Sequence, residues 1–275
     1  MRLSNENMIH IKDGDIEYLQ FKKLLEYKDR INHCITLRTG KLDFSSHGDF
    51  KNTVSTITDN YKRICDKLGT DYKRVVRSSQ EHSDVVKRIY NKINPDKPDM
   101  DLEQLTPVDG LITDKKNIIL ATNAADCLIL MMYDPVNNII GNVHSGWKGT
   151  VSKIGQKAII KMIGECGSNP KDLICCIGPH IGQCHFEVKT DVKDQIYEEF
   201  KNMEQIDKIF EQKNGSWYIS LSLINRLILR HMGVLDENII DSGICTVCNK
   251  DKFYSYRGDG KIDGVHTGLI ELKTT

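Results

Sequence analysis

The stretch from Ala121 to Thr150 reads ATNAADCLILMMYDPVNNIIGNVHSGWKGT, and it decides the fold predicted for the chain. Cys127 opens the apolar run LILMMY, which ends at the turn sequence DPVNN, and a second apolar run, IIGNV, leads directly to His144. Two short apolar runs separated by proline and asparagine are typical of an antiparallel strand pair. We therefore predict a hairpin that carries Cys127 and His144 side by side at one end.

Strand and helix patterns continue on both sides of this hairpin. Two short strands are predicted before it, at 109–113 and 117–123, and a helix with a glycine stop is predicted after it, over 151–167. Further helices are predicted at 60–69, 191–200 and 221–232, and a short strand is expected after the cysteine-bearing loop near residue 248. We find no internal repeat and no long linker, so we predict one α+β domain over residues 1–275.

The charge balance argues against polyanionic partners. Lysine and arginine together number 38, as do aspartate and glutamate, so no net field attracts nucleic acid or an anionic membrane. The N-terminal residues carry scattered charges, and the sequence holds no apolar run of membrane length. We therefore expect a soluble cytoplasmic protein that binds neither nucleic acid nor membrane.

The nine cysteines are expected to be reduced thiols, because their number is odd and no secretion signal is visible. Most fill core positions in this interpretation. Cys245 and Cys248 form a CxxC pair, which needs two further ligands to make a structural zinc site. Cys184 and His185 lie far upstream, so a loop with two free cysteines is the preferred interpretation and a four-ligand site the less favoured one.

Cys127 and His144 allow two kinds of chemistry. A thiolate beside an imidazole is a covalent nucleophile with its base, and the same pair with one more donor binds zinc. The structural alternative is a buried thiol beside a hydrogen-bonded core histidine. Asp126 immediately precedes the cysteine, and we consider it as a general base, as an orienting partner or as a carboxylate with local hydrogen bonds only.

His82 is the best candidate for the third donor, since it follows a predicted strand in the polar context SSQEHSD. Two imidazoles and one thiolate leave one position of a tetrahedral zinc open, which is the pattern of a catalytic site. Such a metal activates water or polarises a substrate group.

Two arginines are candidates for binding an anion such as phosphate. Arg38 lies at the end of a predicted strand and Arg257 lies near the C-terminal end, and each guanidinium offers a planar fork of donors. The alternative for both side chains is a surface salt bridge.

Several of these segments together resemble one family, the YfiH-like proteins, also called the multicopper polyphenol oxidase or laccase-domain family, which act as purine nucleoside phosphorylases. The segments that carry the resemblance cover most of the chain. They are HCITLRTG at 33–40, QEHSDVV at 80–86, DGLIT at 109–113, AADCLILMMYD at 124–134, VHSGWKGT at 143–150, IGPHIGQCHFEV at 177–188 and CTVCNKDKFYSYRGDG at 245–260.

The resemblance implies a zinc site made of His82, Cys127 and His144, in a compact domain whose mixed β-sheets pack as a sandwich flanked by helices. It implies phosphorolysis of adenosine, inosine, guanosine and methylthioadenosine, and hydrolytic deamination of adenosine. The expected partners are then a purine nucleoside and phosphate. Independently of the resemblance, we expect a monomer or a small homo-oligomer. We include His33 with Arg38 and Arg257 among the expected substrate contacts.

Three alternatives stay open. The first is an amide hydrolase for a cell-wall precursor that uses Cys127 and His144. The second is a polyphenol oxidase that uses copper, which the nine scattered histidines disfavour because several copper centres need more donors. The third is a non-catalytic zinc-binding protein.

Overall fold

The predicted hairpin lies at the centre of a six-stranded sheet. Strand β8 (Leu128–Asp134) pairs antiparallel with β9 (Ile139–Ser145), and the register places Ile129 opposite His144. The Asp134 side chain accepts hydrogen bonds from the backbone N–H groups of Val136 and Asn137, which closes the turn at the far end. The hairpin prediction is therefore confirmed, together with the placement of Cys127 beside the end of β9.

The structure is a computed structural model that describes residues 3–45, 54–99, 107–261 and 263–274. Its strands form two six-stranded sheets and one small sheet. The first sheet has the order β1 (Met8–Asp13), β2 (Ile16–Phe21), β3 (Ile31–Thr36), β15 (His266–Leu272), β7 (Ile119–Ala124), β4 (Val75–Arg77). The second has the order β14 (Ile239–Asp241), β10 (Ile174–Ile177), β8, β9, β6 (Gly110–Thr113), β5 (Val86–Arg88). The small sheet has the order β11 (Glu187–Val188), β13 (Ser216–Ile219), β12 (Phe210–Lys213).

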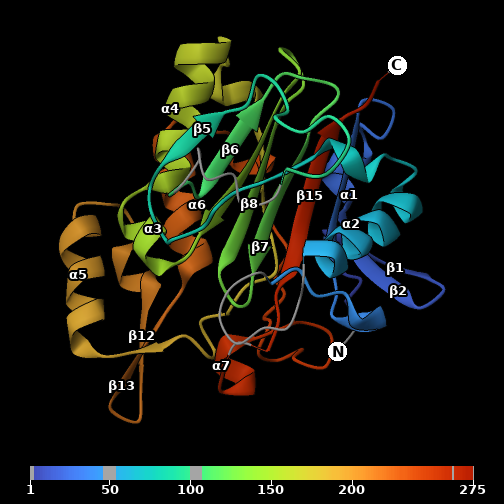
Figure 1. The fold of residues 1–275 in the computed structure, drawn as a ribbon. Coiled ribbons are helices and arrows are strands. Elements are labelled where there is room, and N and C mark those ends of the chain that lie inside the picture. The colour runs from blue at the N-terminus through green and yellow to red at the C-terminus, as the bar shows by residue number, and fades with distance from the viewer. Residues whose placement is uncertain (1–2, 46–53, 100–106, 262, 275) are drawn as a thin grey trace.

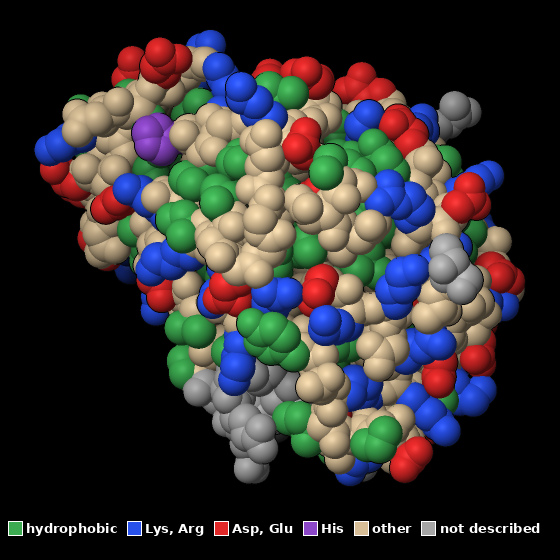
Figure 2. Space-filling model, turned by 90° about the horizontal axis from the view of Figure 1, so that it is seen from above, with side chains coloured by type: hydrophobic (Ala, Val, Ile, Leu, Met, Phe, Trp, Pro, Cys, Tyr) green, Lys and Arg blue, Asp and Glu red, His purple; other side chains and the backbone are tan. Residues whose placement is uncertain are grey.

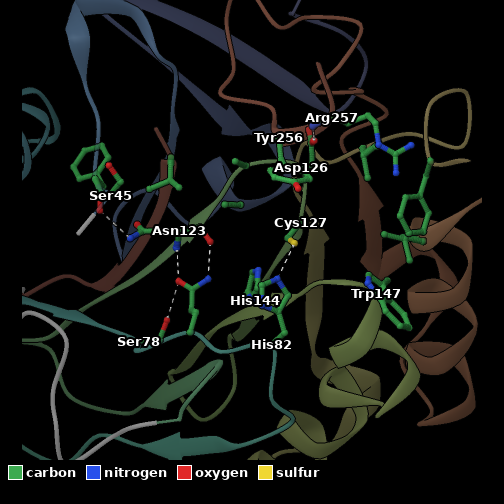
Figure 3. Close-up of a pocket in the computed structure, with 18 of the residues that line it drawn as sticks. Ser45, Ser78, His82, Asn123, Asp126, Cys127, His144, Trp147, Tyr256 and Arg257 are labelled. Carbon is green, nitrogen blue, oxygen red and sulfur yellow. Dashed lines mark hydrogen bonds between the residues drawn. The ribbon is translucent and has the colours of Figure 1, made fainter. Parts of the chain in front are cut away.

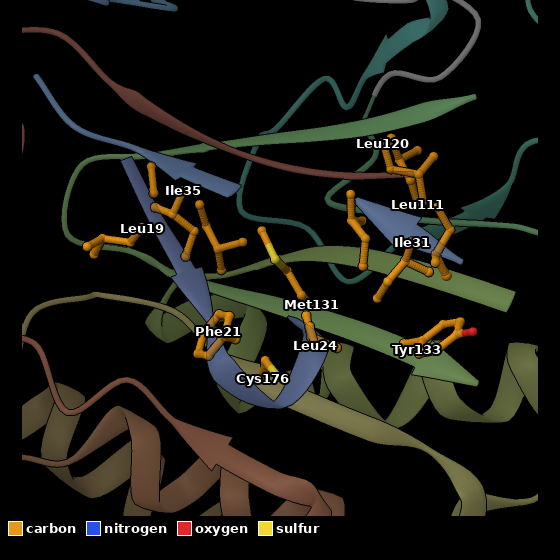
Figure 4. Packing of buried hydrophobic residues seen from close by; sticks show 14 of the residues in the cluster. Leu19, Phe21, Leu24, Ile31, Ile35, Leu111, Leu120, Met131, Tyr133 and Cys176 are labelled. Carbon is orange, nitrogen blue, oxygen red and sulfur yellow. The ribbon is translucent and has the colours of Figure 1, made fainter. Parts of the chain in front are cut away.

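The main core fills the space between the two large sheets. Side chains alternate along β8, so that Ile129 and Met131 point toward the first sheet while Leu128 and Leu130 belong to a second core on the opposite face. Figure 4 shows Met131 packed among residues of the first sheet and its neighbours. Burying each such side chain contributes roughly 1.5–3 kcal/mol, so these contacts dominate the stability of the sandwich.

Helices cover the outer faces of both sheets (Figure 1). Helix α4 (Ile154–Cys166) packs on the second sheet through Ala158 and Ile159, and α2 (Val54–Leu68) packs on the first sheet through Tyr61 and Ile64. The remaining helices are α1 (Lys22–Leu25), α3 (Trp147–Val151), α5 (Thr190–Phe200), α6 (Leu221–His231) and α7 (Tyr256–Asp259). The predicted α+β fold with sandwiched sheets and flanking helices is confirmed.

The short strand predicted after the cysteine-bearing loop is wrong, because the chain there forms turns and then helix α7. The Ser255 hydroxyl accepts a hydrogen bond from the Gly258 N–H and caps the first turn. An N-capping serine followed by a hydrogen-bonded turn favours helix even where aromatic residues suggest a strand.

The surface agrees with the balanced composition. Figure 2 shows basic and acidic side chains interspersed over one face of the molecule, without a large patch of either sign. Among the described residues, none of the helices has the length and apolar character needed to cross a membrane.

The fold creates one crossing point that matters for chemistry. Strand β7 ends at Ala124 in the first sheet and β8 begins at Leu128 in the second, so the intervening residues pass from one sheet to the other. Cys127 lies on this crossing segment. The end of β4 lies beside β7, and His82 follows β4 on the same side of the sandwich.

Candidate functional site

A cavity of about 570 Å³ opens where the crossing segment meets the end of β9 (Figure 3). Its volume lies in the usual range for small-molecule sites, roughly 300–1,000 Å³. The walls combine aromatic rings with polar groups that converge on the space. The lining includes Phe44, Trp147, Phe186 and Tyr256 among the aromatics, and Arg77, His82, Asn123, Asp126, Cys127, His144 and Arg257 among the polar residues.

The structure brings the three predicted metal ligands together at this cavity. One ligand atom from each of His82, Cys127 and His144 lies within 4.8 Å of the others. The distance between Cys127 Sγ and His82 Nε2 is 3.7 Å. A tetrahedral zinc with Zn–S of about 2.3 Å and Zn–N of about 2.0–2.1 Å separates sulfur from nitrogen by about 3.6 Å. The donor set and this spacing therefore fit zinc, and all three residues line the cavity.

Asp109 orients the His144 ring. Its carboxylate Oδ1 lies 2.7 Å from His144 Nδ1, and the register of β6 against β9 places Asp109 directly beside His144. The backbone N–H of His144 also donates to the Asp109 carbonyl at 2.7 Å. With Nδ1 bound to a carboxylate, Nε2 is the nitrogen left to face Cys127, as in the carboxylate–histidine pairs of zinc sites.

The same carboxylate positions the loop that carries His82. The backbone N–H groups of Glu81, His82 and Ser83 all donate to Asp109, at 3.2, 3.1 and 2.8 Å. Successive N–H groups converge on one anion when a residue adopts the left-handed region, and His82 does so with φ of 59°. This conformation costs a non-glycine residue about 1–2 kcal/mol, and the hydrogen bonds to Asp109 offset that cost.

Gln80 fixes the loop from its other side. Its side-chain amide donates to the Asn123 carbonyl at 2.7 Å, and its amide oxygen accepts from the Asn123 N–H at 2.8 Å. This pair imitates a strand pairing between the loop and β7. His82 is therefore held by both sheets before any metal binds.

Gly146 allows the side chains of His82 and Cys127 to approach one another. A Cβ atom at this position would lie 2.9 Å from His82 Cδ2 and 3.0 Å from Cys127 Sγ. Its φ of −64° is open to any residue, so space alone requires glycine here. The small-residue loop after His144 thus makes room for the ligands.

Cys127 and His144 perturb each other's protonation. Burial raises the pKa of the Cys127 thiol, but the charge of His144 and hydrogen bonds from both histidines outweigh it and lower the pKa to about 6. Burial opposes charge on His144 as well, yet the Cys127 thiolate and Asp109 raise its pKa to about 9. Without metal the pair is a thiolate and an imidazolium at neutral pH, so metal binding must release a proton from His144.

Asp126 lines the cavity, but hydrogen bonds occupy both of its carboxylate oxygens. Oδ1 accepts from the Thr246 hydroxyl at 2.5 Å and Oδ2 accepts from the Arg257 N–H at 2.7 Å. Its φ of 85° is in the left-handed region, which marks a backbone held by surrounding contacts. These contacts join the crossing segment to the C-terminal loops.

The expected substrate contacts divide into two groups. Arg257 lines the cavity, although its guanidinium also donates to the carbonyls of His185 and Glu187. Arg38 lies outside the cavity lining and forms ion pairs with Asp259 and Asp263. This is the salt-bridge arrangement that the sequence left open for Arg38.

His33 also lies outside the cavity lining. It is buried in β3, where Nε2 accepts a hydrogen bond from the Phe21 N–H at 2.8 Å, and burial lowers its pKa to about 3. The structure gives His33 a role in the sheet and no contact with the cavity.

Sequence reasoning missed three contributors to this site. Asp109 and Gln80 lie in segments that carried the family resemblance, but nothing in their spacing indicated the partners that they have. Arg77 ends β4, is buried and lines the cavity, with its guanidinium donating to the Phe44 carbonyl at 2.9 Å. Its position at a strand end was the available signal.

The structure also assembles a second cluster that the sequence interpretation did not favour. Ligand atoms of Cys184, His185, Cys245 and Cys248 lie within 4.8 Å of one another, so the CxxC pair has the two further donors that it lacked in sequence.

Comparison with known proteins places these features in context. A family model described as multi-copper polyphenol oxidoreductase laccase matches residues 35–273. Purine nucleoside phosphorylase YlmD of Bacillus subtilis is 33% identical over 220 residues, which cover 79% of this chain and 77% of that protein. Adenosine deaminase RL5, from an unknown prokaryotic organism, is 28% identical over 263 residues, which cover 93% of this chain and 98% of that protein.

A solved structure supports the fold as well. The crystal structure of the Bacillus licheniformis hypothetical protein YfiH matches with a TM-score of 0.83 and 29% identity, and the match covers 96% of this chain and 99% of that chain.

Proposed function

Since this chain belongs to the multi-copper polyphenol oxidoreductase laccase family, we propose that it is a zinc-dependent enzyme that splits purine nucleosides with phosphate and deaminates adenosine. Relatives named purine nucleoside phosphorylase and adenosine deaminase support the substrate class. The single observation that carries the proposal is the convergence of His82, Cys127 and His144 at the cavity.

The cavity has the chemical character that a nucleoside requires. Aromatic side chains such as Trp147, Phe186 and Tyr256 offer faces for a flat purine, and stacking of this kind is tolerant of the base identity. Polar groups of the lining, including Asn123, supply hydrogen bonds. Figure 3 shows His82, Cys127 and His144 between Asn123 on one side and Trp147 on the other.

Arg77 and Arg257 are the phosphate contacts in this proposal. In phosphorolysis a phosphate oxygen bonds to the anomeric carbon of the ribose while the bond from that carbon to the purine nitrogen breaks. Two guanidinium groups on the cavity lining would hold the attacking anion by charge-assisted hydrogen bonds. Arg38 has no part in this step, because it lies outside the lining.

In deamination the oxygen of a water bonds to C6 of adenine and ammonia leaves. Bound zinc supplies Lewis-acid polarisation, through either water or a substrate group. Asp109 keeps Nε2 of His144 directed at the site. We propose that Asp126 positions the cavity wall, since both of its oxygens already accept hydrogen bonds from Thr246 and Arg257.

Two features of the site weigh against a copper oxidase. One cysteine and two histidines match a blue-copper ligand set, but such sites add a weak axial ligand, commonly methionine. The described lining residues include no methionine. The described part of the chain also offers only one other metal cluster, which is rich in thiols and unlike the histidine-rich centres that reduce oxygen.

A thiol-dependent amide hydrolase is the second candidate. Its support is that Cys127 interacts with His144 and His144 with Asp109. Nucleophile, base and carboxylate are connected in the same order in catalytic triads. This reaction needs a free thiolate, whereas the zinc enzyme needs the same sulfur as a ligand. Metal content therefore separates the two.

The test incubates the purified full-length protein with adenosine, with and without phosphate, and separates the products by chromatography. We expect adenine and ribose-1-phosphate only with phosphate, inosine without it, and loss of both in Cys127→Ser together with zinc from this site. Cys166→Ser, which changes a half-buried cysteine outside both clusters, should keep both activities. Absence of all these products would overturn the proposal, and amide hydrolysis by zinc-free protein would favour the second candidate.

A further inference from the structure

We propose that Cys184, His185, Cys245 and Cys248 bind a second zinc ion in a closed, tetrahedral Cys₃His site that holds one wall of the cavity in place. The proposal does not depend on the reaction that the first site catalyses. It follows from how the fold joins two loops, from the distances among four donor atoms and from what surrounds them.

Backbone pairing brings the two loops together. Strands β10 and β14 run parallel, and the loops that follow them continue side by side through a bridge between His180 and Cys245. The His180 N–H donates to the Ile244 carbonyl and the Thr246 N–H donates to the His180 carbonyl. The cluster is therefore a product of the fold, because these bonds set Cys245 beside the turn that carries Cys184 and His185.

The donor atoms are spaced like the corners of a zinc tetrahedron. His185 Nδ1 lies 3.1 Å from Cys184 Sγ, 3.6 Å from Cys245 Sγ and 3.5 Å from Cys248 Sγ. Cys184 Sγ lies 3.7 Å from Cys248 Sγ. Tetrahedral zinc with ordinary bond lengths gives about 3.6 Å for nitrogen to sulfur and about 3.8 Å for sulfur to sulfur. Three of the four distances agree with these values to within about 0.1 Å.

The distance between the two exposed sulfurs does not suit a disulfide. Cys184 Sγ and Cys248 Sγ lie 3.7 Å apart, whereas a disulfide bond is about 2.0–2.1 Å long. Three sulfurs and one imidazole around a single centre are instead the complete ligand set of a structural zinc, with no position left for water.

A backbone N–H and two basic side chains lie beside the cluster, and an ion can enter it from solvent. The Gly182 N–H donates to Cys245 Sγ at 3.2 Å, and a Cβ on Gly182 would lie 3.2 Å from Cys184 Sγ. The side chains of Lys250 and Arg257 line the adjacent hollow, where they offset the negative charge of three thiolates around a divalent cation. Cys184 and Cys248 are exposed, so the site is open to metal from solvent.

The second cluster is connected to the cavity by short contacts. Thr246 lies within the CxxC turn and donates to Asp126 Oδ1, and Arg257 donates to the carbonyl of the ligand His185 while its N–H binds Asp126 Oδ2. A metal that fixes His185, Cys245 and Cys248 would therefore also fix the groups that bind Asp126.

Metal content of the full-length protein tests the proposal. Protein produced with zinc and purified without chelator should contain two zinc ions per chain by mass spectrometry of the metal. Cys248→Ser and Cys127→Ser should each contain one, the double variant none, and the control Cys166→Ser two. The proposal would be overturned if the wild-type protein held one zinc ion per chain and Cys127→Ser held none. It would also be overturned if Cys248→Ser kept two zinc ions per chain.

Alkylation of the unaltered protein gives a second measurement that needs no variant to fold. Iodoacetamide labelling should spare Cys184 and Cys248 in zinc-loaded protein and reach them after chelator treatment, although both are exposed. Cys166 should label equally in the two states. Equal labelling of Cys184 and Cys248 with and without chelator, or a cross-linked peptide joining them under non-reducing conditions, would overturn the proposal.

Cobalt identifies the ligands. In Cys127→Ser the first site has lost its sulfur, so Co²⁺ bound to this variant occupies the second site. The cobalt-loaded variant should show the intense sulfur-to-metal absorption of a tetrahedral ion with three thiolates. The same variant with Cys248→Ser added should lose that absorption. A weak octahedral spectrum in Cys127→Ser would contradict the assignment, whatever becomes of the nucleoside reactions.

Discussion

Asp109 Oδ1 lies 2.7 Å from His144 Nδ1, and the backbone N–H of His144 lies 2.7 Å from the Asp109 carbonyl oxygen. A single residue thus fixes both the strand position and the ring orientation of His144, one of the three proposed metal ligands. Burial would raise the pKa of the Asp109 carboxyl, but His144 and Ser83 outweigh it and keep the pKa below its usual value. Asp109 is therefore the anionic centre around which His82 and His144 are arranged.

Replacing that carboxylate should weaken metal binding. We expect Asp109→Asn to lower the zinc affinity of the first site by roughly 10–100-fold, because the ring loses its anionic partner and the loop of His82 loses part of its anchor. Competition with a chromogenic chelator measures the affinity. Asp114→Asn is the matched control, since Asp114 follows the other end of β6 and pairs with Arg88 and Lys115. Equal affinity in the two variants would refute the positioning role.

Gly146→Ala should damage the first site while leaving the fold intact. The added Cβ meets His82 and Cys127 at about 3 Å, so the ligands must move apart, and we expect zinc affinity to fall at least about tenfold. Gly164→Ala is the control, because nothing lies within 4 Å of its Cβ and alanine in a helix interior should add about 0.5–1 kcal/mol of stability. Unchanged zinc affinity in Gly146→Ala would show that the site tolerates wider spacing.

Arg77 and Arg38 should respond differently in the phosphorolysis assay. Arg77→Lys keeps the charge but loses the planar fork, and we expect KM for phosphate to rise roughly 10–100-fold, which corresponds to about 1.5–3 kcal/mol. Deamination, which uses no phosphate, should change much less. Arg38→Lys should leave KM for phosphate unchanged, because Arg38 lies outside the cavity lining. The reverse pattern would restore Arg38 as the phosphate contact.

His266 should make the protein sensitive to acid. It is buried, neither ring nitrogen has a hydrogen-bond partner within the part of the chain that the structure describes, and burial lowers its pKa to about 3. In the unfolded chain the pKa is about 6.5, so the unfolded state takes up the proton first. The stabilisation is complete above about pH 6.5 and is lost as the pH falls toward 3.

Urea unfolding at pH 7.5 and at pH 5 measures this effect. The free energy of unfolding should fall by about 2 kcal/mol from His266 alone over this interval. In His266→Phe, which keeps a ring against Phe253, the fall should be smaller by that amount. An identical pH dependence in the variant would mean that His266 is not the group responsible.

Much of this arrangement was predictable from sequence because it rests on local patterns. The hairpin follows from two apolar runs and a turn, and the grouping of His82, Cys127 and His144 follows from donor chemistry together with the family resemblance. Asp109 was not predictable in the same way, because its role depends on the register between β6 and β9. The ion-pair partners of Arg38 were not predictable either, since its strand-end position says nothing about the carboxylates of Asp259 and Asp263 that the fold brings to it.

The second cluster shows the same limit from another side. A CxxC pair and a Cys-His pair far apart in sequence carry no signal that they meet. Their meeting depends on the parallel pairing of β10 and β14, which places the loops after both strands at one edge. Only the sheet order contains that information.

The hairpin turn lies at the opposite end of β8 and β9 from Cys127 and His144, and Val136 on it is 64% exposed. The lengths of strands β8 and β9 are therefore constrained by the site, whereas the length of the turn between them is not. Inserting or deleting one residue within either strand would turn His144 or its neighbours to the other face of the sheet. Extra residues at the turn would leave Cys127 and His144 in place. We therefore expect the turn to tolerate insertions, including a fluorescent or affinity label.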